Sequence, residues 1–107
     1  MLSVKQIIIM RIVTEKTITD YIKRNPKSET ALQDWTKKVK LARWNNFADI
    51  KNDFRTVDNV GNQHYVFNIK GNDYRLIVVI KFKLGLVYIR FIGTHAEYDK
   101  IPDCSTI

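Results

Sequence analysis

Three apolar segments between residues 64 and 93 constrain the fold more than any other feature of the chain. They are HYVFNIK (64–70), DYRLIVVIKF (73–82) and LVYIRFIG (86–93), and each is rich in the β-branched and aromatic residues typical of strands. The links between them, Gly71-Asn72 and Lys83-Leu84-Gly85, are short enough for antiparallel hairpins and too short for a crossover to a parallel strand. The sequence therefore predicts a three-stranded antiparallel meander.

The part of the chain before the meander has the pattern of one strand and three helices. IIIMRIVT (7–14) predicts a strand that joins the sheet, and apolar residues at helical spacing predict helices over 15–24, from 26 to about 43, and over 45–54. Pro26 fits the first turn of the second of these helices, and RTVDNVGNQ (55–63) is predicted to be a polar loop. We therefore expect an α+β fold, in which a mostly antiparallel sheet of about four strands carries the N-terminal helices on one face.

Length and cysteine content indicate a single domain without disulfide bonds. A chain of 107 residues is long enough to bury its own core, and we expect residues 1–107 to form one domain with 102–107 as a tail. The single cysteine, Cys104, permits neither an intramolecular disulfide nor a Cys-based metal site, and it favours a reducing compartment. The apolar run at 7–10 is interrupted by Arg11 and suits neither a signal peptide nor a membrane span, so we expect a cytoplasmic protein.

The charge balance indicates an anionic partner. The net charge of +7, from 18 basic and 11 acidic residues, favours nucleic acid, although a positive charge also serves solubility alone. A basic cluster at the end of the second predicted helix consists of Lys37, Lys38, Lys40 and Arg43. We expect this cluster to lie on one helix face, where it would contact phosphates or dock an acidic protein.

The turn lengths predict the register of the meander. A two-residue loop at Gly71-Asn72 places Asn68 opposite Arg75, and a three-residue loop at 83–85 places Phe82 opposite Leu86. The second loop also places Gly93 opposite Arg75. The side chains of Asn68 and Arg75 should therefore lie side by side, next to Gly93.

The period of two along a strand then divides the meander into two faces. The larger and more aromatic face is predicted to pack on the helices, and it comprises Tyr65, Phe67, Ile69, Tyr74, Leu76, Val78, Ile80, Tyr88 and Ile92. Arg75 is predicted to share the more open face with Ile77, Val79, Val87, Ile89 and Phe91. Arg90 falls on the core face in this register, which predicts a buried pair with a helix carboxylate.

The segment GTHAEYD (93–99) combines a helix start with groups that can transfer protons. Thr94 and Glu97 have the spacing of a capping box, which predicts a short C-terminal helix. His95 would occupy the first position of this helix, close to Arg75, where the helix dipole favours an anion and a neutral imidazole. Such a histidine either accepts and donates protons or simply begins a surface helix.

Arg75 and Tyr98 are further candidates for chemistry on the open face. The guanidinium of Arg75 can bind a phosphate in a bidentate manner and stabilise the charge of a phosphoryl transition state, or it can form a salt bridge to Asp73 or Asp99. Tyr98 can orient a phosphate, stack on a base or assist proton transfer, or it can pack the last helix onto the sheet. For each of the two residues, the chemical and the structural role both stay open at this point.

Polar residues gather around the first hairpin and form a candidate substrate-binding group of His64, Asn68, Lys70 and Asn72. Asn68 is the best placed of them because it faces Arg75, whereas a histidine at a strand start such as His64 is often structural. Neither His64 nor His95 has the partners of a metal site, so no metal ligand is assigned. Walker, dinucleotide-binding, nucleophile-elbow and HExxH motifs are absent from the sequence.

The segments HYVFNIKGNDYRL (64–76), YIR (88–90) and GTHAEYD (93–99) resemble the HigB family of toxins from type II toxin–antitoxin systems, which belong to the RelE-like superfamily. The resemblance extends over residues 10–101. Many such toxins begin near the position of Met10, so residues 1–9 are interpreted either as an N-terminal extension or as the result of an upstream start choice. We therefore expect this segment to be weakly ordered or to lengthen the first strand.

This resemblance implies a RelE-like fold and a ribosome-dependent endoribonuclease that cleaves mRNA without a metal or another cofactor. The ribose 2'-OH would attack the adjacent phosphate, with Arg75 stabilising the phosphate, His95 acting as acid or base and Tyr98 assisting. In the superfamily, basic residues often occupy the hairpin strand where this chain has Val66 and Asn68, which leaves the general base unassigned. The implied partners are mRNA, the ribosome and a HigA-like helix-turn-helix antitoxin, with operator DNA contacted only through the antitoxin. The alternative function is a non-catalytic RNA-binding or antitoxin-docking module on the same fold.

Overall fold

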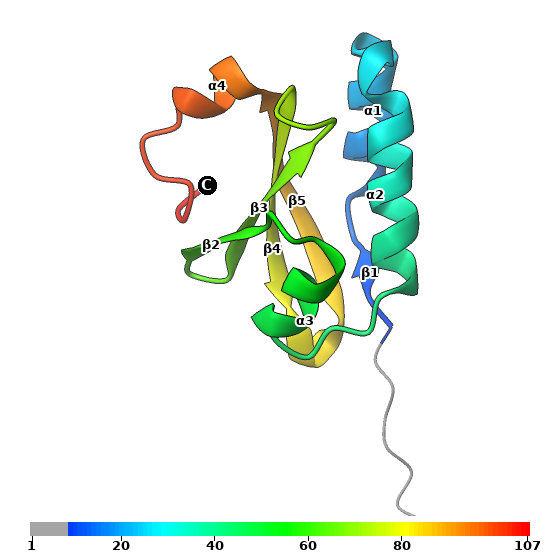
Figure 1. Cartoon of the computed structure of the whole chain (residues 1–107), viewed down its shortest axis with the longest axis vertical. Helices are drawn as coiled ribbons and strands as arrows, with labels where there is room; N and C mark the ends of the chain where they lie inside the picture. Colours follow the sequence, from blue (N-terminus) through cyan, green and yellow to red (C-terminus); the bar gives the residue numbers. More distant parts are fainter. Residues whose placement is uncertain (1–8) are drawn as a thin grey trace, which may run out of the picture.

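The computed structural model of the protein describes residues 9–107. These residues form a sheet of order β1-β5-β4-β3-β2, whose strands are β1 (Arg11–Ile12), β2 (Asp58–Gly61), β3 (His64–Ile69), β4 (Tyr74–Lys81) and β5 (Leu86–Thr94) (Figure 1). Neighbouring strands are antiparallel except for β1, which runs parallel to β5. The predicted α+β class, with the first strand joined to the meander, is therefore confirmed.

The described residues contain four α-helices, which are α1 (Glu15–Arg24), α2 (Glu29–Leu41), α3 (Phe47–Asp53) and α4 (His95–Asp99). Helix α1 has the predicted bounds. Pro26 was expected in the first turn of the second helix, but it begins a separate 3-10 turn, Pro26–Ser28, in which the buried Ser28 Oγ donates to the Asn25 carbonyl at 2.7 Å. Helix α2 ends at Leu41, so Arg43 lies beyond the helix.

Strand β1 is shorter than predicted. Of the expected strand at 7–14, only Arg11 and Ile12 pair with β5, and residues 7 and 8 lie outside the described residues, as does most of the expected extension at 1–9. Met10, which precedes β1, does not extend the strand. Its backbone N–H donates to the carbonyl of Ala42, the residue after the end of α2, at 3.3 Å. At the other end, the Thr14 hydroxyl accepts from Ile89 N at 3.1 Å just before α1 begins.

The segment 55–63, predicted to be a polar loop, contains the edge strand β2. Asp58 pairs with Val66 and Asn59 with Tyr65, and an irregularity follows before Gly61 pairs with His64. Asn62 and Gln63 then turn the chain with φ values of 53° and 62°. The prediction was wrong because β2 is exposed along most of its length and therefore carries no alternation of apolar and polar residues.

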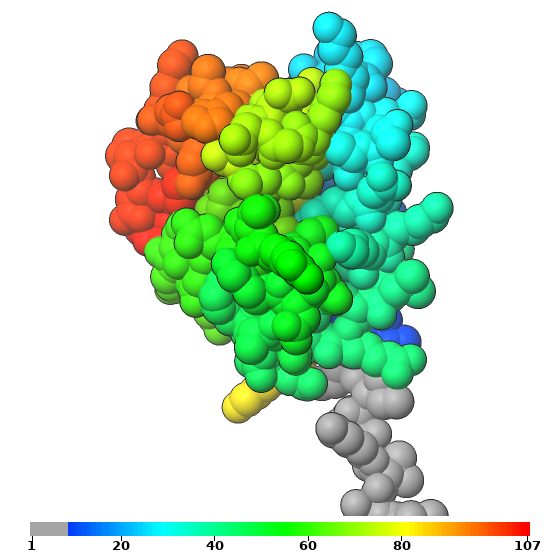
Figure 2. Space-filling view, viewed as in Figure 1, coloured from blue at the N-terminus to red at the C-terminus, as the bar shows by residue number. Residues whose placement is uncertain are grey.

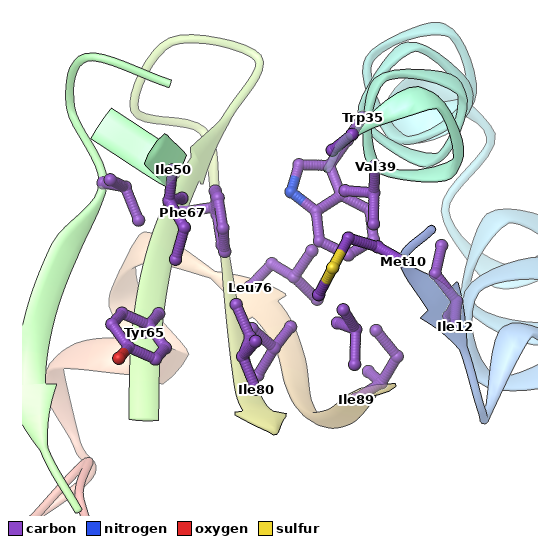
Figure 3. Packing of buried hydrophobic residues seen from close by; sticks show 14 of the residues in the cluster. Met10, Ile12, Trp35, Val39, Ile50, Tyr65, Phe67, Leu76, Ile80 and Ile89 are labelled. Atoms are coloured by element: carbon purple, nitrogen blue, oxygen red, sulfur yellow. The ribbon is translucent and has the colours of Figure 1, made fainter. Parts of the chain in front are cut away.

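The core lies between the sheet and helices α1, α2 and α3. Figure 3 shows Trp35 and Val39 of α2 directed toward Phe67 and Leu76 of the sheet. The Phe67 ring, 1% exposed, lies 5.5 Å from the ring of Trp35, and it also contacts the rings of Trp44 and Phe54 at centroid distances of 6.5 Å and 5.0 Å. This aromatic cluster joins α2, α3 and the segment between them to the middle of β3.

The predicted register is confirmed at Arg75, although the turn beside it was predicted wrongly. Asn68 pairs with Arg75 and Arg75 with Gly93, as expected. Near the turn, however, Leu86 pairs with Lys81 and not with Phe82, because a 3-10 turn (Phe82–Leu84) and the left-handed Gly85 (φ 66°) lengthen the loop. A bulge compensates for the longer loop, since Ile77 pairs with Phe91 while Val78 pairs with Ile89.

The bulge corrects the assignment of several side chains on β5 to the two faces. Val87 and Ile89, predicted on the open face, belong to the core, whereas Tyr88, predicted in the core, borders a cleft with His64 and Val79 on the other side. Arg90 does not form the predicted buried pair with a helix carboxylate. It is exposed, and its Nε donates to the Ile107 backbone oxygen at 2.8 Å.

The face of the sheet opposite the helices is partly covered by α4 and the tail (Figure 1). His64 Nε2 lies 2.9 Å from the backbone oxygen of Ile107, and Asn62 Nδ2 donates to the Ser105 carbonyl at 3.0 Å. Val66 and Ile77 are buried on this face, although they lie outside the main core cluster. The open face therefore has an apolar floor between its polar side chains.

Replacing Phe67 by Ala should lower the free energy of unfolding by about 3–5 kcal/mol, because the variant leaves a cavity among three aromatic rings. Urea denaturation followed by tryptophan fluorescence measures this change. The control is Leu84→Ala, which removes a side chain that is 68% exposed and should change stability by less than about 0.5 kcal/mol. Equal losses in the two variants would contradict the packing described here.

Candidate active site

The start of α4 is held by the predicted capping box. Thr94 Oγ1 accepts from Glu97 N at 3.2 Å, and Glu97 Oε1 accepts from Thr94 N at 2.8 Å. Hydrogen bonding to Thr94, from its backbone N–H first and its side chain second, lowers the pKa of the Glu97 carboxyl. His95 N donates to the Asp73 carbonyl at 3.1 Å, so the helix start is also joined to the hairpin that carries Arg75.

Arg75 is oriented by two asparagines and an aromatic ring. Its Nη1 donates to Asn68 Oδ1 across the strand pair and to Asn72 Oδ1 at 3.2 Å in the turn. The guanidinium carbon lies 5.4 Å from the centre of the Tyr98 ring, within the range of a cation–π contact. Among the described residues Arg75 forms no ion pair, so the alternative salt bridges to Asp73 and Asp99 do not occur. Its positive charge is held in place without being neutralised.

Tyr98 supplies a phenol that stays protonated at neutral pH. Burial, together with the adjacent Cys104 side chain and the charge of Asp58, raises the pKa of Tyr98 to about 12, even though the Arg75 charge acts in the opposite direction. A phenol of this kind donates hydrogen bonds and does not act as a base at pH 7. Tyr98 therefore both supports the guanidinium and offers an O–H donor.

A cleft of about 290 Å³ opens beside Arg75 and Tyr98, and it is lined by Lys51, Thr56, Val57, Asp58, Val66, Asn68, Arg75 and Tyr98. A second cleft of about 410 Å³ is lined by Thr56, Asn68, Gly71 and Asn72. The two clefts share Thr56 and Asn68 and are therefore neighbours. Together they are called the groove below, and their lining extends from Tyr98 of α4 to Gly71 and Asn72 in the β3–β4 turn. In Figure 2 these two elements, orange and yellow-green, lie at the same end of the molecule.

His95 belongs to the same helix as Tyr98 but does not line either cleft. Its Nδ1 is 3.0 Å from Asp99 Oδ2, and its side chain is 43% exposed. Donation from Nδ1 to this carboxylate fixes the ring and leaves Nε2 for proton exchange. Because His95 and Tyr98 are three residues apart in α4, they lie on the same side of the helix.

Two other predicted substrate contacts lie outside the groove. His64, 5% exposed, pairs with Val79 at the far end of β3, and its Nδ1 lies 2.7 Å from the Asn62 carbonyl. The other ring nitrogen, Nε2, contacts the backbone oxygen of Ile107, so both ring nitrogens of His64 bind backbone oxygens. These contacts agree with the structural role that was predicted from the sequence as the alternative for His64. Lys70 is exposed in the turn with φ 52° and lines neither cleft.

The basic cluster does not form the single helix face that was expected. Lys40 forms an ion pair with Glu15 of α1 at 2.6 Å. Lys37 lines a hollow between α1 and α2 together with Lys40 and Glu15. Lys38 points toward α3, where its Nζ donates to the Asp53 carbonyl at 2.6 Å. Arg43 lies beyond the end of α2. The density of basic residues in the sequence therefore did not indicate a continuous patch.

Lys51 and Asp58 are the charged residues of the cleft that sequence reasoning missed, and Thr56 and Val57 between them were missed as well. Lys51 belongs to α3 and its Nζ donates to the Val57 carbonyl at 3.2 Å, whereas Asp58 begins β2. Asp58 was overlooked because residues 55–63 were expected to be a loop, which could not be placed beside Asn68. Lys51 lies in the helix predicted over 45–54, and the sequence did not show where that helix packs on the sheet. The only signal in the sequence for a site here was the large share of polar residues at 55–63, between the third predicted helix and the next strand.

Within residues 9–107, no group of three or more His, Cys, Asp or Glu side chains could hold a metal ion. None of the helices in this part of the chain is long and apolar enough to cross a membrane.

Comparison with known proteins gives consistent similarities. A sequence model of the HigB toxin family, described as the RelE-like toxic component of a toxin–antitoxin system, matches residues 28–101. The mRNA interferase toxin HigB of Escherichia coli K12 is 30% identical over 92 residues, which cover 84% of this chain and 88% of that protein. The mRNA interferase HigB of Escherichia coli O6:H1 is 27% identical over 94 residues, which cover 86% of this chain and 91% of that protein.

The capping box generates a pH-dependent contribution to stability. Because the folded-state pKa of Glu97 is lowered, its stabilisation is present above the ordinary pKa of 4.5 and is lost as the pH falls through the lowered value. Glu97→Gln removes the titrating carboxyl and should therefore show a smaller loss of stability than the wild type between pH 7 and pH 3, whereas Thr94→Ser should follow the wild type. Denaturant titrations at both pH values measure the difference, and identical profiles for all three proteins would contradict it.

Proposed function

The chain belongs to the HigB family of RelE-like toxins, and on this premise we propose that it is an mRNA interferase, an endoribonuclease that cleaves mRNA. The observation that carries the proposal is the position of Arg75. Its guanidinium lies in a polar cleft, oriented by the oxygens of Asn68 and Asn72 and by the Tyr98 ring, and no carboxylate of residues 9–107 is bound to it. A cation held in this way is suited to a phosphodiester.

Cleavage proceeds by attack of the ribose 2'-OH on the adjacent phosphorus. A bond forms between the 2'-oxygen and phosphorus while the bond to the 5'-oxygen breaks, which leaves a 2',3'-cyclic phosphate and a free 5'-OH. The reaction requires RNA because DNA has no 2'-OH. Arg75 binds the phosphate oxygens and stabilises the negative charge that increases in the transition state.

His95 and Tyr98 act as donors at the phosphate and the leaving group. The protonated His95 ring, held by Asp99 through Nδ1, transfers the Nε2 proton to the departing 5'-oxygen. Tyr98 donates a hydrogen bond to a phosphate oxygen, in keeping with its raised pKa. Asn68 and Asn72 position Arg75, and their amides also lie in the groove where the neighbouring nucleotide would be bound. Each of these roles is assigned to a side chain, and we propose that cleavage requires neither a metal nor another cofactor.

The proposed partners are the ribosome, which presents the mRNA, and a HigA-like helix-turn-helix antitoxin that inhibits cleavage. The net charge of +7 supports approach to the anionic ribosome. Operator DNA would be contacted through the antitoxin alone. We further propose that the whole chain acts as a single domain.

Arg75→Ala should reduce cleavage by a factor on the order of 10²–10³, because it removes the stabilising donor at the phosphate. Arg75→Lys keeps the charge but loses the planar donor fork, so it should fall between Arg75→Ala and the wild type. The proteins are induced in cells without antitoxin, and mRNA ends are mapped for 2',3'-cyclic phosphates. Arg24→Ala, an exposed arginine on α1, is the matched control and should cleave like the wild type.

The same experiment tests the proposed function itself. If the induced wild type neither slows growth nor creates new mRNA ends, the interferase proposal fails. Incubation of purified protein with mRNA, with and without ribosomes, tests the proposed ribosome dependence, since only the mixture with ribosomes should contain cleaved mRNA.

His95→Gln should lower the rate of cleavage roughly 100-fold or more, because the leaving 5'-oxygen loses its proton donor. Asp99→Asn keeps the imidazole but removes its charged partner, so its effect should be smaller. Single-turnover cleavage of ribosome-bound mRNA measures both rates. A His95→Gln enzyme as fast as the wild type would remove His95 from the mechanism, and the role of Arg75 would be unaffected.

A further inference from the structure

The pairing of β2 places Asp58 on the open face of the sheet beside the Arg75 row. Asp58 pairs with Val66 and Val66 with Ile77, so the three residues form one row across β2, β3 and β4. Asn68 and Arg75 form the next row on the same face, because they are two residues further along β3 and two residues back along β4. Adjacent rows on one face are within reach of long side chains. Asp58 and Arg75 accordingly line the same cleft.

The carboxylate of Asp58 has no other task among the described residues. It accepts no hydrogen bond there and forms no ion pair, and its side chain is exposed. Of the other carboxylates near this end of the molecule, Glu97 closes the capping box and Asp99 binds His95, whereas Asp73 lines neither cleft. Asp58 forms no ion pair with Arg75 in this part of the chain, and both side chains line the cleft of about 290 Å³. An anion bound by Arg75 would therefore lie beside a free carboxylate.

We propose that Asp58 is the general base of the reaction, an assignment that rests on the proposed function. With the scissile phosphate on Arg75, the Asp58 carboxylate accepts the proton of the ribose 2'-OH as the 2'-oxygen bonds to phosphorus. The bond to the 5'-oxygen breaks at the same time, and this oxygen takes a proton from His95. The proton balance closes when Asp58 releases its proton to water and His95 takes one up.

The other groups of the cleft are unsuited to this role. Arg75 is always protonated, and the ammonium of Lys51 is a donor that lies beside the backbone of Val57. Tyr98 retains its proton far above neutral pH, and the remaining polar groups are hydroxyl and amide side chains. Lys51 supports the assignment in a different way, because a cation in the same cleft helps to balance the repulsion between the Asp58 carboxylate and the phosphate.

The test compares Asp58→Asn with Asp34→Asn, a matched control on the exposed face of α2 and outside both clefts. Single-turnover cleavage of ribosome-bound mRNA should slow roughly 100-fold or more in Asp58→Asn and stay within about twofold of the wild type in Asp34→Asn. Binding is measured separately with an mRNA that carries a 2'-deoxynucleotide at the cleavage position. Asp58→Asn should bind this mRNA at least as tightly as the wild type, because the substitution removes a negative charge beside the phosphate. A variant damaged in its fold would lose binding as well.

The outcomes separate this inference from the proposed function. If the wild type cleaves and Asp58→Asn cleaves less than about tenfold more slowly, Asp58 is not the base, while the interferase proposal stands. A slower Asp58→Asn with equally weakened binding also overturns the assignment, because Asp58 would then have a structural or binding role. If the wild type itself does not cleave mRNA, the proposed function fails and the assignment fails with it. Asp58→Ser, with thermal melting of each variant, serves as the second substitution and should give the same separation of rate from binding.

Discussion

The packing of Phe67 against Trp35, Trp44 and Phe54 is the interaction on which the rest of the structure depends. It fixes which face of β3 is directed to the helices, and the alternation along a strand then directs Val66 and Asn68 to the opposite face. The same cluster positions α3, which supplies Lys51, and the segment that leads into β2. The aromatic cluster on the helix side therefore determines which side chains line the cleft on the other side of the sheet. The link between core and cleft is the alternation of side chains along β3.

The sheet could be predicted from the sequence as far as its signals are local. The hairpin at Gly71-Asn72 has a short turn between clearly alternating strands, and its register was predicted correctly up to the pair of Asn68 and Arg75. The pair of Arg75 and Gly93 was also predicted correctly, but two errors cancelled: the loop before Leu86 is one residue longer than assumed, and the bulge in β5 restores the alignment. A bulge has no signature in the apolar pattern, because Val87, Tyr88 and Ile89 suit either face. Its position follows from tertiary packing, in which Val87 and Ile89 contribute more to the core than Tyr88 and Arg90 would.

The candidate site was predictable in part for the same reason. Arg75, Asn68 and Tyr98 belong to elements with strong local patterns, and the capping box of Thr94 and Glu97 fixed the start of α4. Lys51 and Asp58 come from a short helix and an exposed edge strand, whose positions depend on contacts with distant residues. The basic cluster shows the converse error, since a high density of charge in the sequence was interpreted as one surface. In the structure Lys38 and Lys40 bind groups on opposite sides of α2.

The way Arg75 is held has a consequence for its chemistry. An arginine bound to a carboxylate is well oriented, but most of its charge is balanced before a substrate arrives, and a phosphate must then compete with the carboxylate. Asn68 and Asn72 provide oriented amide oxygens with no net charge, and the face of the Tyr98 ring adds a weaker attraction. The guanidinium is thus preorganised while its charge remains available to the phosphate. The carboxylate of the cleft, Asp58, lies in a neighbouring row, so in the proposed mechanism it would act on the 2'-OH without neutralising the cation assigned to the scissile phosphate.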